Sequence, residues 1–185
     1  MSRRMPRILV IEDERAQREP LARYLTRSGF SVGEARTGEE GLQALGEGEF
    51  AVLLTDLRLP GCDGLEVIRQ AQVLEPQLGI ILITAYASVE SAVEALRLGA
   101  HDYILKPLTP DTLYFRLLRA FEKREAFSPV YRLIETGQTH EAIEICAQGR
   151  GEHPRYRVDF MRLEAELHGI LGHTEAAEEL YREIL

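Results

Sequence analysis

The stretch Phe50-Ala-Val-Leu-Leu-Thr-Asp56 decides the fold, because it is a short apolar run that ends in an aspartate. Similar apolar runs begin at Ile8 and Gly79, and a fourth, Tyr103-Ile-Leu105, leads into Lys106-Pro107. Short apolar runs separated by helical stretches are typical of parallel strands in one sheet. We therefore predict a doubly wound α/β domain built around a parallel sheet.

Each of these runs ends in polar side chains. The first is followed by Glu12-Asp13, the second ends in Asp56, the third in Thr84 and the fourth in Lys106. The carboxyl ends of parallel strands lie along one edge of a sheet, where ligands bind in folds of this type. We therefore expect these side chains to converge. Carboxylates, a hydroxyl and an ammonium in one crevice suit a divalent cation and a phosphoryl group.

Asp56 is the candidate nucleophile, since a carboxylate can attack phosphorus and carry an aspartyl phosphate. Glu12 and Asp13 are candidate metal-binding residues, because Mg²⁺ prefers oxygen ligands and keeps several waters. Thr84 and Lys106 could each contact a phosphoryl oxygen. Each residue alone also has an ordinary explanation, such as a helix cap, a solvated loop acid or an exposed lysine. The combination at four strand ends is what makes the pattern specific.

The first two-thirds of the chain alternates between strands and helices. We expect strands at Ile8–Ile11, Ser31–Ala35, Phe50–Thr55, Gly79–Thr84 and His101–Leu105. We expect helices at Glu14–Ser28, Gly38–Leu45, Leu65–Leu74, 89–98 and 110–124. Expected N-caps are Thr37, Ser88 and Thr109, with Glu40 as the capping-box partner of Thr37. The step Lys106-Pro107 suits a cis peptide in a tight turn.

Two of these helices show an apolar face at helical spacing. Residues Val89, Ala92, Val93 and Leu96 fall at i, i+3, i+4 and i+7 of the fourth helix. The fifth carries Leu113, Leu117, Leu118 and Phe121 on one face. Such stripes predict amphipathic helices that pack on a sheet.

The composition limits the functions that this chain can have. Its 185 residues suffice for one ordinary domain and a small addition, and 45% of them are hydrophobic. The net charge of −8 argues against general affinity for nucleic acid or anionic membranes. No stretch approaches the roughly 20 apolar residues of a membrane span, and the apolar run after the basic N-terminus is too short for a signal peptide. With two distant cysteines, a reduced cytoplasmic protein is the simplest expectation.

Four motifs together resemble the receiver domain of two-component response regulators. They are Ile11-Glu12-Asp13-Glu14, Leu54-Thr-Asp56-Leu-Arg-Leu-Pro60-Gly-Cys-Asp-Gly64, Ile83-Thr84-Ala85-Tyr86-Ala87 and Gly99-Ala-His-Asp-Tyr103-Ile-Leu-Lys106-Pro107. The resemblance covers about residues 6–125 and is greatest to receivers of the NtrC type. It implies a flavodoxin-like, CheY-like fold with five parallel strands in the order 2-1-3-4-5.

The resemblance also implies a function. Asp56 would accept a phosphoryl group from a sensor histidine kinase or a phosphotransfer protein. Asp13, Asp56 and the backbone carbonyl of Arg58 would bind Mg²⁺, with Glu12 in the acid pair and acting through water. The protein would not be an enzyme beyond Mg²⁺-dependent self-phosphorylation and self-dephosphorylation.

In such a receiver, Lys106 would neutralise charge during transfer, Thr84 would move toward the phosphoryl group and Tyr103 would rotate. The face formed by residues 88–124 would then be remodelled, and this face pairs receivers or meets an output partner. A homodimer through it is one possible outcome. Arg58, two residues after Asp56, is long enough to reach over the pocket and to alter the lifetime of the phosphate.

The tail forms a separate region, so we predict a receiver at residues 1–125 and an all-α segment at 126–185. The tail has 6 Lys and Arg against 11 Asp and Glu, and this net charge of −5 disfavours a DNA-binding domain. Gly137-Gln-Thr-His-Glu-Ala142 matches Gly172-His-Thr-Glu-Ala-Ala177 at an offset of 35 residues. The offset resembles the period of tetratricopeptide repeats, roughly 34 residues, which implies helical hairpins that bind a protein partner. A small helical bundle with a chance match is the alternative.

The tail holds two such units, whereas these repeats need about three for independent stability. We therefore expect these helices to dock on the receiver or on a partner chain, or the chain to be a fragment of a larger transcription activator or signalling enzyme, and we favour the fragment. The five histidines, at positions 101, 140, 153, 168 and 173, lack metal-binding spacing in the sequence. The phosphodonor histidine should therefore belong to another protein. We expect Cys62 to be an ordinary loop thiol, and the alternative is that it acts as a redox switch.

Overall fold

The computed structural model describes residues 6–86 and 88–185. Residues 1–5 and Ala87, which belong to the basic N-terminal stretch and to the Thr84 motif of the sequence analysis, lie outside the described residues. The chain divides into two compact units, Met1–Arg124 and Glu125–Leu185. The transition falls within one continuous helix rather than in a loop.

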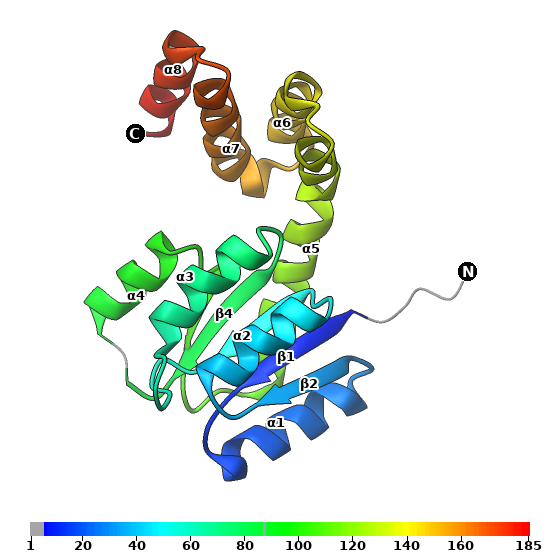
Figure 1. Cartoon of the computed structure of the whole chain (residues 1–185), viewed down its shortest axis with the longest axis vertical. Coiled ribbons are helices and arrows are strands. Elements are labelled where there is room, and N and C mark those ends of the chain that lie inside the picture. Colours follow the sequence, from blue (N-terminus) through cyan, green and yellow to red (C-terminus); the bar gives the residue numbers. More distant parts are fainter. Residues whose placement is uncertain (1–5, 87) are drawn as a thin grey trace. The chain divides into compact units, whose positions relative to one another are not determined.

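The first unit is built on a five-stranded parallel sheet (Figure 1). Its strands are β1 (Arg7–Ile11), β2 (Ser31–Ala35), β3 (Val52–Thr55), β4 (Gly79–Thr84) and β5 (Asp102–Leu105). They lie in the order β2-β1-β3-β4-β5, and every neighbouring pair is parallel. The structure therefore confirms the flavodoxin-like strand order. All five carboxyl ends meet at one edge.

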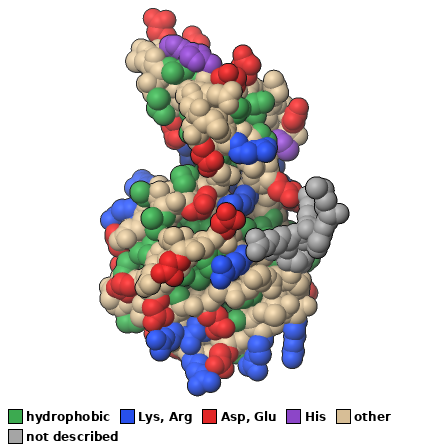
Figure 2. Space-filling view, turned by 45° about the vertical axis from the view of Figure 1, so that its right-hand side comes forward, with side chains coloured by type: hydrophobic (Ala, Val, Ile, Leu, Met, Phe, Trp, Pro, Cys, Tyr) green, Lys and Arg blue, Asp and Glu red, His purple; other side chains and the backbone are tan. Residues whose placement is uncertain are grey.

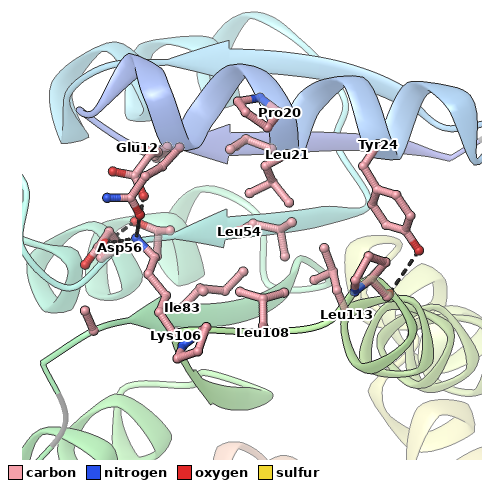
Figure 3. A pocket seen from close by; sticks show the side chains of 17 residues that line it. Glu12, Pro20, Leu21, Tyr24, Leu54, Asp56, Ile83, Lys106, Leu108 and Leu113 are labelled. Atoms are coloured by element: carbon pink, nitrogen blue, oxygen red, sulfur yellow. Dashed lines mark hydrogen bonds and ion pairs between the residues drawn. The ribbon is translucent and has the colours of Figure 1, made fainter.

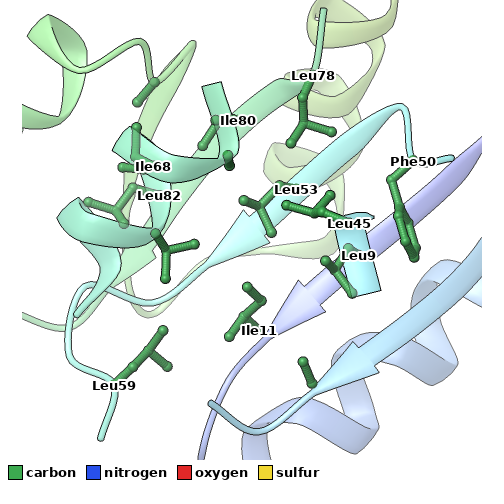
Figure 4. Close-up of a cluster of buried hydrophobic side chains, with 14 of the residues drawn as sticks. Leu9, Ile11, Leu45, Phe50, Leu53, Leu59, Ile68, Leu78, Ile80 and Leu82 are labelled. Atoms are coloured by element: carbon green, nitrogen blue, oxygen red, sulfur yellow. The ribbon is translucent and has the colours of Figure 1, made fainter. Parts of the chain in front are cut away.

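Helices cover both faces of the sheet. They are α1 (Arg15–Arg27), α2 (Gly38–Glu47), α3 (Gly64–Leu74), α4 (Val89–Arg97) and α5 (Pro110–Glu135). Leu9, Leu53 and Leu82 of the sheet pack with the buried side chains of α2, α3 and α4 (Figure 4). On the other face Ile8 and Ile81 pack with α1 and with Leu117 of α5. The central strands β1, β3 and β4 are thus buried on both faces, which explains their continuous apolar runs.

Threonine and serine caps fix where α2, α4 and α5 begin, and at α5 the Thr109 Oγ1 atom accepts a hydrogen bond from the Thr112 backbone N–H at 3.2 Å. Thr37 Oγ1 accepts a hydrogen bond from the Glu40 backbone N–H at 3.2 Å. Ser88 and Ser91 form a reciprocal capping box at the start of α4. The Glu40 side chain does not complete the predicted box at Thr37, since its carboxylate accepts from the backbone N–H of Arg36 at 2.8 Å. That N–H lies one residue before the cap.

The apolar stripe of α4 does not face the core, contrary to the prediction. Val89 is 76% exposed and Leu96 is 52% exposed, whereas Ala95 is fully buried. On α5, Leu117 is buried but Leu118 is 37% exposed. Periodicity identifies an apolar face without saying what covers it, and α4 packs on the sheet through its small residue instead.

The second unit consists of the last turns of α5, then α6 (Thr139–Glu152), the short 3₁₀ helix η1 (Pro154–Tyr156), α7 (Arg157–Ile170) and α8 (Thr174–Ile184). Its core is centred on Phe127 and Phe160, whose rings stack with centroids 4.0 Å apart. The charged residue Glu164 is buried in this unit and forms an ion pair with Arg150, with Nε and Oε2 3.2 Å apart. None of the helices in the described ranges has the length and apolar character needed to cross a membrane.

The internal match at an offset of 35 residues is also a structural match. Gly137 and Gly172 adopt positive φ angles of 75° and 77°, which an L side chain would strain. Each glycine is followed two residues later by the start of a helix, α6 at Thr139 and α8 at Thr174. The matching alanines, Ala142 and Ala177, are both buried. The two segments therefore have the same local design.

Candidate functional site

A lysine joins two carboxylates at the carboxyl edge of the sheet. Lys106 Nζ donates to Asp56 Oδ2 at 2.5 Å and to Glu12 Oε2 at 2.6 Å (Figure 3). The three residues are distant in the chain, but each follows directly after a strand, and β1 and β3 are adjacent. The parallel sheet is therefore what brings them together.

Burial gives this cluster strong electrostatic coupling. Asp56 is 8% exposed and Glu12 is 5% exposed. Burial raises the pKa of Glu12, and the hydrogen bond and charge of Lys106 offset only part of this rise. Burial alone would lower the pKa of Lys106, but Asp56 and Glu12 together outweigh it and the pKa is raised. The ammonium therefore stays charged between the two acids.

The loop that carries Glu12 and Asp13 is held by Arg18, a residue that the sequence analysis missed. The buried Arg18 guanidinium donates to the backbone carbonyl of Glu12 at 2.7 Å and to that of Asp13 at 3.3 Å. It also forms an ion pair with Glu34 at 3.4 Å. The Asp13 residue itself is exposed at the rim. Arg18 thus fixes the backbone while the Asp13 side chain remains accessible.

Gln17 is a second contact that was not predicted. Its Oε1 accepts a hydrogen bond from Lys106 Nζ at 2.7 Å, and its amide donates to Glu14 at 2.6 Å. The available signal was its position in the first turn of α1, four residues after Asp13. Lys106 therefore has three acceptors in this state.

The segment after Asp56 is tightly packed. The backbone N–H of Arg58 donates to Asp56 Oδ1 at 3.0 Å, and a Cβ atom at Gly64 would lie 2.2 Å from the Asp56 carbonyl oxygen. Only glycine fits there without moving the backbone of the candidate nucleophile. The Arg58 guanidinium lies 3.8 Å from the centroid of the Tyr86 ring. It is therefore held against an aromatic side chain.

Thr84 and Tyr103 lie next to the cluster without contacting Asp56 by a hydrogen bond. The fully buried Thr84 accepts a hydrogen bond from the Tyr86 backbone N–H at 3.1 Å. The Tyr103 hydroxyl lies 3.2 Å from Ser91 Oγ and 3.5 Å from the Tyr86 carbonyl oxygen. The peptide bond between Lys106 and Pro107 is cis, as predicted. All the predicted polar groups of the strand ends thus lie at one edge.

The comparison with protein families identifies this arrangement. Residues 8–118 match the family described as response regulator receiver domain. The chain belongs to that family. The receiver is homologous to two-component response regulators, and all four sequence motifs lie within the matched region.

Several relatives have defined names. The C4-dicarboxylate transport transcriptional regulatory protein DctD of Rhizobium meliloti is 32% identical over 144 residues, which cover 78% of this chain and 30% of DctD. The transcriptional regulatory protein ZraR of Escherichia coli is 37% identical over 113 residues, or 61% of this chain and 26% of ZraR. The present chain therefore spans less than a third of the length of these two relatives.

Solved structures show the same fold. A CheY-like receiver from Methanospirillum hungatei has a TM-score of 0.64 and 33% identity, and the match covers 65% of this chain and 97% of that one. The response regulator TrrA of Thermotoga maritima, solved in complex with Mg²⁺-BeF, has a TM-score of 0.58 and 32% identity. That match covers 63% of this chain and 99% of TrrA.

The receiver carries a donor set that fits Mg²⁺. Glu12, Asp13 and Asp56 provide three carboxylates against the single ammonium of Lys106. Within the described ranges, no three His, Cys, Asp or Glu residues already enclose a metal position. Mg²⁺ does not require such a cage, because it keeps several waters and takes one or two carboxylates. The residues present therefore fit the ion.

A cavity of about 600 Å³ opens beside the polar cluster of the receiver. Glu12, Asp56 and Lys106 form its polar end, and the rest of its lining is mostly apolar (Figure 3). The apolar part includes Pro20 and Leu21 from α1, Leu54, Ile83, Leu108 and Leu113. A molecule that enters this cavity would therefore meet an apolar surface beside the acids.

The loop thiol of the receiver is not activated. Burial raises the pKa of Cys62, and the charges of Glu39, Glu66 and Asp63 add to the rise. Its backbone N–H donates to Glu39 at 3.0 Å, which ties the loop to α2. A raised pKa reduces the thiolate fraction and hence reactivity. This environment favours the ordinary loop thiol over the redox switch.

Proposed function

We propose that this chain is a phosphoacceptor switch in which Asp56 takes a phosphoryl group from a histidine on a sensor kinase or phosphotransfer protein. The proposal rests on the charged hydrogen bond that Lys106 Nζ donates to the buried Asp56 carboxylate at 2.5 Å, beside the acid pair. Family membership and the complex of TrrA with Mg²⁺-BeF support it.

The chemistry divides among the residues of the cluster. A carboxylate oxygen of Asp56 would attack phosphorus in line with the leaving histidine nitrogen, so that a P–O bond forms as the P–N bond breaks. Asp13, Asp56 and the Arg58 carbonyl would hold Mg²⁺, with Glu12 acting through water, and the ion would supply charge neutralisation. Lys106 would contact another phosphoryl oxygen.

We propose no further catalytic activity for the chain. The cluster contains no separate acid–base residue beyond those assigned to phosphoryl acceptance and Mg²⁺ binding. Self-phosphorylation from a small phosphodonor and self-dephosphorylation would then be its only reactions. Arg58, which lies over Tyr86 beside Asp56, would influence how readily water reaches the phosphate.

The test is incubation with acetyl phosphate and Mg²⁺, followed by intact mass measurement. We expect the wild type to gain the mass of one phosphoryl group and Asp56→Asn to gain none. Asp63→Asn is the matched control, because it changes an acid of the same loop whose capping role at α3 an asparagine can keep. Equal gain by wild type and Asp56→Asn would place the nucleophile elsewhere.

The conformational change caused by phosphorylation would pass through Thr84 and Tyr103. Thr84 would give up its hydrogen bond from the Tyr86 N–H and turn toward the phosphoryl oxygens. Tyr103 would rotate away from Ser91 into the space that Thr84 leaves. Since Ser91 belongs to the capping box of α4, this movement would alter the start of that helix.

We propose that the face of residues 88–124 forms a homodimer in the phosphorylated state. It exposes Val89, Val93, Leu96, Leu105 and Phe115 in the unphosphorylated chain. Leu96→Glu should prevent self-association measured by light scattering, whereas Leu74→Glu, at an equally exposed leucine on α3, should not. If both variants associate like the wild type, this face is not the interface.

For the second unit we propose tetratricopeptide-like hairpins that bind a protein. The matching helix starts and buried alanines support this, and the net charge of −5 disfavours nucleic acid. Deleting residues 126–185 should leave phosphorylation intact and abolish partner capture. If the truncated chain still captures the partner, the output lies elsewhere.

The alternative is the N-terminal part of a larger transcription activator or signalling enzyme. Its support is that this chain spans only 30% of DctD and 26% of ZraR. The length of the intact gene product separates the two proposals.

A further inference from the structure

Three of the five histidines lie in the second unit with His173 near each of the other two, although the sequence gives them no metal-binding spacing. His140 lies at the start of α6, His168 in the last turn of α7 and His173 at the N-cap of α8. The ring centroids of His168 and His173 are 5.5 Å apart, and those of His140 and His173 are 6.2 Å apart. Figure 2 shows histidine side chains grouped on the surface of the C-terminal helices.

The closest pair has the separation of two ligands on one metal ion. His168 Nδ1 lies 3.3 Å from His173 Nδ1. Two imidazole nitrogens on a tetrahedral Zn²⁺, each at roughly 2.0–2.1 Å from the metal, are separated by about 3.3 Å. The ring centres of such a pair are about 5 Å apart by the same geometry. His168 and His173 therefore need little rearrangement to chelate zinc.

We propose that His140, His168 and His173 form a binding site for a divalent transition metal of the zinc class. As the side chains stand in the described part of the chain, no three such residues enclose a common metal position. The His140 ring must move about 1 Å closer to His173 to reach the spacing of zinc-bound rings. His140 is exposed, so its side chain has room to turn. Water completes the tetrahedron.

The surroundings of the three histidines favour the binding of a cation. Glu141 and Glu175 lie in the first turns of α6 and α8, the two helices that begin at the site. Their negative charge offsets the positive ends of these helices and would attract a cation.

Metal binding would act on the fold of the second unit. The three ligands belong to three helices, so a bound ion would link α6, α7 and α8 at one end. When a metal binds the folded state and not the unfolded chain, its binding free energy adds to stability. Without a metal, the same separation of the two Nδ1 atoms would correspond to a hydrogen bond between the two rings, which contributes little to stability at an exposed position.

The experiment is calorimetric titration of the whole chain with Zn²⁺ in excess Mg²⁺, which would compete for the acidic site proposed in the receiver. We expect one zinc per chain. His168→Ala and His173→Ala should each weaken binding by more than the roughly 10- to 100-fold that loss of an outer-shell partner causes. His153→Ala, in the same unit but outside the group, and Cys62→Ser should bind as the wild type does. Circular dichroism checks that each variant keeps its helices.

Zinc should also raise the thermal midpoint of the wild type but not that of the His168→Ala, His173→Ala double variant. Absence of wild-type binding, or unchanged affinity in the folded double variant, would overturn the proposal. If His140→Ala binds zinc as tightly as the wild type, His140 is not a ligand and the proposed three-histidine site is wrong.

Discussion

Replacement of Lys106 by methionine should destabilise the first unit, because the buried carboxylates of Glu12 and Asp56 lose their counter-charge. Methionine keeps most of the apolar stem of lysine but removes the ammonium that donates to Glu12, Gln17 and Asp56. Both carboxylates would then remain at the strand ends without their cation. The effect to be measured is the free energy of unfolding of the first unit.

The structure sets the size of the effect. Removing one partner of a buried ion pair costs about 3–5 kcal/mol, because the remaining charge has no compensation. The Lys106 side chain is 17% exposed, and those of Glu12 and Asp56 are 7% and 10% exposed. Since water reaches the lysine in part, the lower end applies, and we expect a loss of about 3 kcal/mol at neutral pH without Mg²⁺.

The loss should shrink in acid. Burial already raises the pKa of Glu12 in the folded wild type, and removal of Lys106 would raise it further. A carboxyl whose folded pKa exceeds its unfolded value makes the folded state bind more protons, so stability falls as pH rises. The penalty should therefore be largest above the raised folded pKa and nearly absent below about pH 4, near the unfolded value.

Native-state hydrogen exchange of the β3 amides measures this quantity for the first unit alone. Lys106→Arg keeps the charge and should lose less than Lys106→Met. Excess Mg²⁺ should stabilise the methionine variant more than the wild type, since a cation replaces a cation. An equal loss at pH 7 and in acid would show that packing rather than charge is responsible, and would refute the reasoning.

Three other outcomes follow from the packing. Gly64→Ala should lower the free energy of unfolding, measured by urea titration, by roughly 2 kcal/mol or more, the penalty of overpacking, because its Cβ would lie 2.2 Å from the Asp56 carbonyl oxygen. Gly151→Ala, whose Cβ would meet nothing within 4 Å, should be neutral or stabilising in the same measurement. Ser88→Ala removes the cap of α4 and should cost about 1 kcal/mol, seen as faster exchange of the first α4 amides with β4 unaffected. Phe160→Ala should destabilise the second unit by about 3–5 kcal/mol, since its ring is fully buried, while phosphorylation from acetyl phosphate continues at the wild-type rate. A matching loss of phosphorylation would show that the receiver depends on the second core.

The residue pattern was sufficient to predict the parallel sheet and the convergence of its polar ends, and the resemblance to receiver domains supplied the strand order. The reason is that buried parallel strands are short apolar runs, and the fold places all their carboxyl ends at one edge. Glu12, Asp56 and Lys106 could be brought together in this way because each directly follows a strand. Their exact hydrogen-bond partners were not needed for that inference.

Other features depend on packing that no local pattern records. The apolar stripe of α4 was visible, but its direction was not, because Ala95 rather than the larger residues fits against the sheet. Gln17 and Arg18 were missed since they act from a helix turn rather than a strand end. His140, His168 and His173 meet only after three helices have packed, so their spacing along the chain was uninformative.

The three hydrogen bonds of Lys106 give the resting receiver an internal counter-ion. A divalent cation or phosphoryl group that enters the site must exchange partners with this ammonium rather than fill an uncompensated negative pocket. Both states of the switch would then keep their buried acids neutralised. Depletion of Mg²⁺ should therefore silence signalling while leaving the folded protein intact and ready to respond when the ion returns.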